Sequence, residues 1–151
     1  MRVFDLDGTL FDTFAATKAA YEKAGMPEFT LEHFRSPNST WQCSEEIRTK
    51  KRELYKDFLF AVKPAWAFEF YRPSEDIVLT GASQDSVQLL RNKFNLPLCC
   101  PFGYGLTRAS KATILRNLAS IGPELIYYDD DPEIEPLLKH IENLTLVLGG
   151  Q

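Results

Sequence analysis

Near the start of the chain runs the stretch Val3-Phe4-Asp5-Leu6-Asp7-Gly8-Thr9-Leu10, which decides the predicted fold. Apolar residues lead directly into Asp5, and Gly8 allows a sharp turn just beyond it, so the pattern predicts a short buried strand ending at Asp5. Open α/β sheets place their ligands at the carboxyl ends of strands. We therefore expect the carboxylates of Asp5 and Asp7 to lie at a binding site.

Two carboxylates so close together repel each other, and a bound divalent cation is the usual remedy. Oxygen ligands suit Mg²⁺ better than a soft metal. Taken alone, an Asp-x-Asp pair is equally well interpreted as an acidic turn after a strand, because carboxylates are common turn residues. The whole stretch is more specific than the pair.

Strand and helix patterns alternate along the rest of the chain. Apolar runs predict further strands at residues 77–79, 96–100, 125–128 and 144–148. Periodic patterns predict helices at residues 14–25, 31–35, 44–59, 84–94, 110–122 and 132–140, with Ser44 and Ser110 as N-caps. This alternation predicts an α/β protein with a doubly wound, Rossmann-like, five-stranded parallel sheet.

The block between the first two predicted strands is too long for a plain crossover. It is predominantly helical in pattern, so we interpret it as a small inserted helical cap. The expected division assigns residues 1–13 and 72–151 to the core and residues 14–71 to the cap.

Polar groups follow three more strands or begin the helices after them. Thr80 and Gly81 offer a hydroxyl and backbone N–H groups to a phosphoryl group. Lys111 stands at the start of a helix, where the helix dipole disfavours a cation, which indicates a role other than local stability. Lys93 and Arg108 are less well placed competitors. The run Asp129-Asp130-Asp131 ends a strand and is costly to bury unless a cation occupies it.

In this order, the four motifs resemble those of the haloacid dehalogenase (HAD) superfamily of phosphatases and phosphotransferases. The resemblance implies that Asp5 is the nucleophile, Asp7 the general acid/base and Lys111 the stabiliser of the nucleophile and phosphate charge. It also implies phosphate binding by Thr80, Gly81 and Lys111. The cap resembles the small helical insert of phosphoglycolate phosphatase relatives only in its opening helix.

The same resemblance implies an Mg²⁺ site formed by Asp5, Asp7, Asp129 and Asp130. Asp7 is expected to contribute its backbone carbonyl, and Asp130 to orient a ligand or Lys111. The longer form of the last motif would place an acid four residues after Asp129, where this chain has Glu133. Whether Asp130, Asp131 or Glu133 is the second acid therefore stays open.

Composition limits the function classes. The net charge of −4 disfavours a strongly basic nucleic-acid binder. The three cysteines, Cys43, Cys99 and Cys100, have no metal-ligand spacing and are expected to be structural thiols in a reducing compartment. No run approaches the length of a membrane span and no leader pattern appears, so a cytoplasmic protein without membrane contact is expected.

The expected reaction is Mg²⁺-dependent hydrolysis of a phosphate monoester through an aspartyl-phosphate. A small phosphorylated metabolite or a nucleotide is the expected substrate, and the oligomeric state is open. A base-stacking ring among Trp41, Trp66, Phe68, Phe70 and Tyr71, with a cation from Arg48, Lys50, Lys51 and Arg52, would instead suit a nucleotide or a polynucleotide end. A simpler interpretation assigns these rings to the cap's own core and these charges to a solvated helix face.

Two alternatives belong to another class. A catalytically silent phosphate-binding module would not need all of the acids and the lysine. A receiver domain of two-component signalling would need a phospho-accepting Asp at the end of a middle strand, and the nearest candidate, Asp57, lies in a helical pattern.

Overall fold

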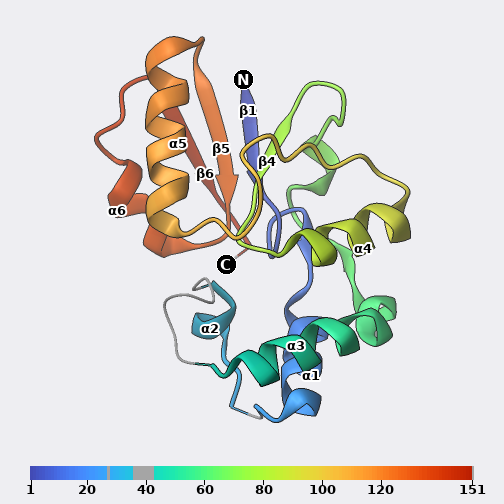
Figure 1. Ribbon diagram of the computed structural model, residues 1–151. Helices are drawn as coiled ribbons and strands as arrows, with labels where there is room; N and C mark the ends of the chain where they lie inside the picture. Colours follow the sequence, from blue (N-terminus) through green and yellow to red (C-terminus); the bar gives the residue numbers. More distant parts are fainter. Residues whose placement is uncertain (27, 36–42, 151) are drawn as a thin grey trace.

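A four-stranded parallel sheet forms the centre of the computed structural model, which describes residues 1–26, 28–35 and 43–150. The strand order is β4 (Ile77–Leu79), β1 (Arg2–Asp5), β5 (Leu125–Asp129) and β6 (Leu144–Leu148). All neighbours in this sheet run parallel (Figure 1). The predicted α/β class with a parallel sheet is confirmed, whereas the predicted number of five strands is wrong.

Residues 96–100 are the expected strand that does not form. They run beside β4, where the Cys99 carbonyl accepts a 2.8 Å hydrogen bond from the Val78 N–H. Pro97 has no N–H to donate, and Pro101 closes the segment. Since proline cannot contribute a donor to a ladder, the apolar run does not join the sheet as a strand.

Helices cover both faces of the sheet. On one face, α5 (Arg108–Ile121) and α6 (Glu135–Leu138) share a buried cluster with Val3, and the 3₁₀ turn η3 (Pro132–Ile134) precedes α6. On the other face, α4 (Gln84–Phe94) shares a cluster with Phe4. Successive residues of β1 thus face opposite layers, as the period of a strand requires.

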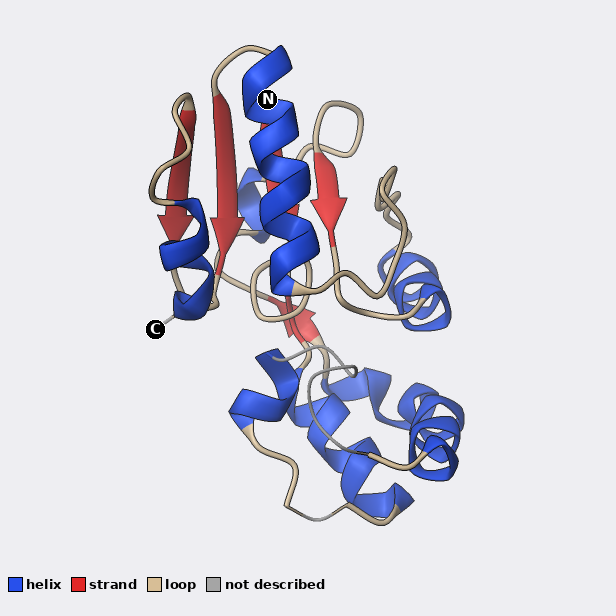
Figure 2. Ribbon diagram, turned by 60° about the vertical axis from the view of Figure 1, so that its left-hand side comes forward, coloured by secondary structure: helices blue, strands red, loops and turns tan. Residues whose placement is uncertain are grey.

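Three helices gather beyond the carboxyl ends of the strands: α1 (Phe14–Ala24), α2 (Leu31–Arg35) and α3 (Glu45–Tyr55) (Figures 1 and 2). The 3₁₀ helix η1 (Lys56–Ala61) continues α3, so the helix expected through residue 59 changes its hydrogen bonding after Tyr55.

The chain leaves and re-enters the core through a short antiparallel pair. β2 (Phe11–Asp12) pairs with β3 (Lys63–Pro64), and the 3₁₀ turn η2 (Phe68–Phe70) follows. The two connections between the core and the helices at its carboxyl end therefore lie side by side. The boundaries at residues 13 and 72 stay predictions.

Helix capping agrees with the sequence at one predicted cap and differs at the other. Ser44 accepts a hydrogen bond from the Ile47 N–H, as expected of an N-cap. At α5 the cap is Thr107: its hydroxyl oxygen accepts a hydrogen bond from the Ser110 N–H, and the Ser110 hydroxyl oxygen accepts one from the Thr107 N–H, which together form a reciprocal capping box. The expected start at Ser110 is therefore wrong, and Lys111 is the fourth residue of the helix.

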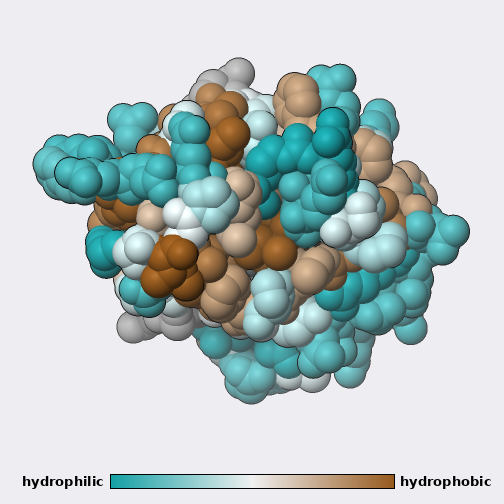
Figure 3. All heavy atoms as spheres, turned by 90° about the horizontal axis from the view of Figure 1, so that it is seen from above, coloured by the Kyte–Doolittle hydropathy of each residue, from teal (hydrophilic) through white to brown (hydrophobic). Residues whose placement is uncertain are grey.

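Figure 3 looks onto the end of the molecule where the strands begin. Hydrophobic residues cross the middle of this face, with hydrophilic residues around them. The carboxyl ends of the strands lie at the opposite end of the sheet (Figure 1). Asp5 ends β1, Asp129 ends β5, and Thr80 directly follows β4. Within the described residues, no helix combines the length and the apolar character needed to cross a membrane.

Candidate active site

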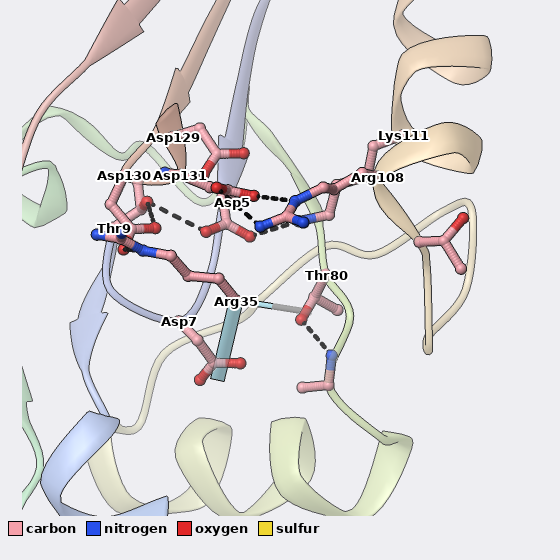
Figure 4. Close-up of polar contacts among 12 residues, drawn as sticks. Asp5, Asp7, Thr9, Arg35, Thr80, Arg108, Lys111, Asp129, Asp130 and Asp131 are labelled. Atoms are coloured by element: carbon pink, nitrogen blue, oxygen red, sulfur yellow. Dashed lines mark hydrogen bonds and ion pairs between the residues drawn. The ribbon is translucent and has the colours of Figure 1, made fainter. Parts of the chain in front are cut away.

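Asp5, the last residue of β1, is buried at the centre of the site and contacts Lys111 directly. The Lys111 Nζ donates a 2.7 Å hydrogen bond to its Oδ1. Asp129 occupies the same position at the end of the neighbouring strand β5, and Thr80 follows β4 on the other side (Figure 4). The sheet therefore brings residues 5, 80, 111 and 129 together at one edge, as their positions after strands predicted.

A buried acidic cluster consists of Asp5, Asp129 and Asp130. One carboxylate oxygen from each lies within 4.8 Å of the others. Thr9 holds part of the cluster in place, since its hydroxyl lies 3.2 Å from Oδ2 of Asp5 and 3.3 Å from Oδ1 of Asp130. Three oxygen ligands so arranged fit a divalent cation such as Mg²⁺.

Burial disfavours the charged form of these acids. It raises the pKa of Asp5 and of Asp129 to about 7, and that of Asp130 to about 6, with repulsion from the neighbouring carboxylates adding to it. Lys111 acts in the opposite direction on Asp5 and Asp129 but does not cancel the desolvation. Without a cation, burial makes the charged form of these carboxylates unfavourable. A bound cation would stabilise that charged form.

Further hydrogen bonds fix the orientation of Asp129. Its Oδ2 accepts a 2.6 Å bond from the Tyr127 hydroxyl, and its Oδ1 accepts a 2.9 Å bond from the Asp131 N–H. Such supporting contacts around a metal ligand restrict its rotation.

The candidates for the second acid lie in three different environments. Asp130 belongs to the buried cluster. Asp131 turns away to form a bidentate pair with Arg108, at 2.6 and 3.1 Å, and accepts the Glu133 N–H as the cap of η3. Glu133 is exposed. The geometry favours Asp130, which remains a proposal.

Asp7 lies apart from the acidic cluster. Its carboxylate accepts a 2.6 Å hydrogen bond from the Thr13 hydroxyl and borders the cavity, where Lys51 of α3 acts to lower its pKa. Burial raises its pKa. Its side chain is thus suited to holding a proton, and the metal ligand expected from Asp7 stays its backbone carbonyl.

Thr80 and Gly81 form the turn after β4. The buried Thr80 hydroxyl accepts a 2.9 Å bond from the Ala82 N–H and keeps its own proton for another acceptor. Gly81 lines the cavity, and a Cβ there would lie 3.0 Å from the Leu106 carbonyl oxygen. The close approach of the chain before α5 therefore favours glycine at this position.

A cavity of about 110 Å³ separates these core residues from the helices beyond them. Its cap side is formed by aromatic and cationic side chains of α1–α3 and the segments between them. These are Tyr21, Phe29, His33, Phe34, Arg35, Arg48, Lys51, Arg52 and Tyr55.

No family model and no curated protein sequence matches this chain. Solved structures do match. A hydrolase from Pseudomonas syringae aligns with a TM-score of 0.62 and 16% identity over 97% of this chain and 82% of its own. CbbY from Rhodobacter sphaeroides, in complex with phosphate, aligns with a TM-score of 0.66 and 15% identity over 98% of this chain and 85% of its own. A haloacid dehalogenase-like family protein from Streptococcus pneumoniae aligns with a TM-score of 0.50 and 16% identity over 97% of this chain and 82% of its own.

The chain has the haloacid dehalogenase-like fold. The resemblance drawn from the four sequence motifs is confirmed at this level. The candidate residues occupy the carboxyl edge of the HAD-like sheet, which is the edge that faces the cap.

Two residues that contact the acidic cluster were missed from the sequence. Thr9 contacts both Asp5 and Asp130. Arg35, from α2, places its Nε 3.8 Å from Oδ2 of Asp130. The motif around Thr9 offered a signal for the first, whereas nothing in the sequence places Arg35 over the HAD-like core.

The aromatic residues singled out for base stacking lie elsewhere. Trp66 packs against Gly149 and Gly150 and donates a 3.1 Å hydrogen bond to the Gly8 carbonyl. The rings of Phe68, Phe70 and Tyr71 contact aromatic residues of the buried core. These four rings do not line the cavity, and they pack against the sheet core rather than forming a core of the cap. Trp41 lies outside the described residues.

Proposed function

We propose that this protein is an Mg²⁺-dependent phosphohydrolase that cleaves a phosphate monoester through an aspartyl-phosphate on Asp5. The Lys111–Asp5 contact beside the cluster of Asp129 and Asp130, at the base of a cavity, carries this proposal. The similar structures support it, since two are described as hydrolases and one was solved with phosphate.

In the first step, a carboxylate oxygen of Asp5 attacks phosphorus and the bond from phosphorus to the leaving oxygen breaks. Lys111 offsets the repulsion between the carboxylate and the phosphate. Its pKa is raised by Asp5 and Asp129, against the effect of burial, so it stays charged. Asp7, whose pKa burial raises, gives its proton to the leaving oxygen.

In the second step, water attacks phosphorus of the aspartyl-phosphate and Asp7 takes the water proton. The bond between Asp5 and phosphorus breaks, which regenerates the carboxylate and releases inorganic phosphate. The hydrogen bond from Thr13 holds Asp7 on the cap side of the cavity, where both the leaving group and the water would arrive.

Mg²⁺ held by Asp5, Asp129 and Asp130 would supply positive charge that stabilises the phosphoryl oxygens in the transition state. Thr80 and the N–H groups around Gly81 would bind the same phosphoryl group from the side of β4. These assignments follow from the placement of the residues around one cavity.

The size of the cavity favours a small phosphorylated metabolite as the substrate. At about 110 Å³ it is below the ~300–1,000 Å³ typical of sites for larger ligands. Four of the five rings proposed for stacking a base, those of Trp66, Phe68, Phe70 and Tyr71, do not line the cavity, which reduces the support for a polynucleotide end. The receiver-like alternative also loses support, since Asp57 is exposed in η1 and does not line the cavity.

Hydrolysis of p-nitrophenyl phosphate by the purified chain tests the proposal. We expect activity that requires Mg²⁺, disappears with a chelator and falls by at least about 10³-fold in Asp5→Asn. Asp57→Asn is the matched control, because it removes an exposed carboxylate outside the cavity. Full activity in chelator or in Asp5→Asn would show that the proposed chemistry is wrong.

A further inference from the structure

The cavity carries more positive charge than its acidic cluster requires. Six cationic side chains line it: Arg35, Arg48, Lys51, Arg52, Arg108 and Lys111. Three of these contact acids of the core, because Lys111 binds Asp5, Arg108 binds Asp131 and Arg35 lies near Asp130. The other three belong to α3, on the opposite side of the cavity.

These α3 residues form one face of the helix. Positions 51 and 52 are each three or four residues from both position 48 and position 55, where Tyr55 stands, which places the four together along one face of a helix. All four line the cavity. Lys50 belongs to a different face, where it is exposed and pairs with Glu46 one turn earlier. The basic run of the sequence is thus divided between a cavity wall and solvent.

Lys51 is held against two aromatic rings. Its Nζ lies 4.8 Å from the ring centre of Tyr55 and 5.4 Å from that of Tyr21. Both tyrosines are buried. No ion pair between Lys51 and a carboxylate occurs within the described part of the chain. Burial lowers the pKa of Lys51, and Asp7 opposes this only in part.

A partly desolvated ammonium held against two rings is stabilised by an anion placed beside it. A site built for such a group also discriminates against ligands that lack it, since binding them leaves the charge unmatched. The same cavity ends at Asp5 and Lys111, where the phosphoryl group of the proposed reaction binds. One small ligand can therefore reach both ends.

We propose that the α3 face of the cavity, with Lys51 at its centre and Arg48 beside it, binds a second anionic group of the substrate. The substrate class is a small phosphate monoester that also carries a carboxylate or a second phosphate. This proposal rests on the proposed function for its phosphoryl end. The α3 end is a separate binding site with its own test.

Phosphonates test the second site without turnover, because their P–C bond is not hydrolysed. The probes are 3-phosphonopropionate, which carries a carboxylate, 1,3-propylenediphosphonate, which carries a second phosphonate, and the uncharged-tail analogue propylphosphonate. Calorimetry in Mg²⁺ gives each Kd. We expect at least one of the doubly anionic probes to bind about tenfold or more tightly than propylphosphonate. Whichever binds more tightly distinguishes the carboxylate from the phosphate class.

Variants locate the preference. In Lys51→Met, which keeps the apolar stem on the tyrosine rings, the ratio of Kd values should fall to within about threefold of one. Lys51→Arg should restore a preference, and the control Lys50→Met should keep the wild-type ratio. If circular dichroism shows that Lys51→Met does not fold, Arg48→Met replaces it, since Arg48 lies one turn away on the same face.

Equal affinities of the wild-type protein for all three probes would overturn the proposal, as would a preference that survives in folded Lys51→Met. Failure of the proposed phosphatase reaction is separate. It would appear as absent p-nitrophenyl phosphate hydrolysis while the second-anion preference and its loss in Lys51→Met persist.

Discussion

The Nζ of Lys111 lies 2.7 Å from Oδ1 of Asp5, although 106 residues separate them in the chain. Lys111 is in the first turn of α5, where the helix dipole disfavours a cation. Asp5 and Asp129 compensate for this, and they raise the Lys111 pKa against the effect of burial. The ammonium is therefore held at the site by charges of the core rather than by its own helix.

Replacing Lys111 tests whether this charge serves the reaction. We expect Lys111→Met to lower kcat/KM on p-nitrophenyl phosphate by about 10²- to 10³-fold, because it removes a preorganised charge from the transition state. Lys93→Met is the control, since Lys93 is exposed, donates to the Leu59 carbonyl and does not line the cavity. Equal activity of Lys111→Met and the wild type would contradict the assignment.

Asp129 and Asp131 are two positions apart in the chain, and their replacement should have different effects on Mg²⁺ binding. Asp129→Asn is expected to weaken Mg²⁺ binding by at least about tenfold, measured by calorimetry. Asp131→Asn should leave the Mg²⁺ affinity nearly unchanged and lower the free energy of unfolding by about 1–3 kcal/mol, because it breaks the bidentate pair with Arg108. The reverse pattern would identify Asp131 as the ligand.

The regular elements could be predicted where a pattern of side chains was sufficient. Helix α4 has the bounds expected from its periodicity, and β4 and β6 coincide with their apolar runs. Residues 96–100 have a similar apolar pattern but lack a donor at Pro97, so the pattern alone gave one strand too many. Thr107 and Ser110 are both common capping residues, and only the reciprocal bonds identify the first of them as the cap.

The candidate site was predictable on its core side for a topological reason. Asp5, Thr80 and Asp129 each end or follow a strand, and parallel strands bring such positions to one edge. The cap side depends on how short helices pack over that edge, which local patterns do not record. Arg35 and the division between Lys50 and Lys51 therefore required the structure.

Gly8 is expected to be essential for the position of Asp130. Its φ is +81°, and a Cβ would lie 2.3 Å from Oδ2 of Asp130. Gly8→Ala should therefore displace this carboxylate, weaken Mg²⁺ binding and lower stability by more than the ~1 kcal/mol of backbone strain alone.

Gly25→Ala is the matched control for Gly8→Ala. Gly25 also has a positive φ, +112°, but a Cβ there would contact nothing within 4 Å. Gly25→Ala should therefore introduce backbone strain without a steric clash, and its Mg²⁺ affinity should be unchanged. Calorimetry and chemical denaturation of both variants separate the two effects, and equal Mg²⁺ affinities in the two variants would refute the role of Gly8.

Mg²⁺ should counteract the pH dependence of stability that the buried acids create. The pKa of Asp5 and of Asp129 is raised from 3.8 to about 7. Between these values the folded protein binds more protons than the unfolded chain, so without metal its stability falls as pH rises. In chelator, Tm should be lower at about pH 7.5 than at about pH 5.5. Because Mg²⁺ binds the deprotonated carboxylates, it should raise Tm more at the higher pH. A metal-free Tm that rises across this window, or an Mg²⁺ effect larger at the lower pH, would contradict the assignment of Asp5 and Asp129 to a metal-binding cluster.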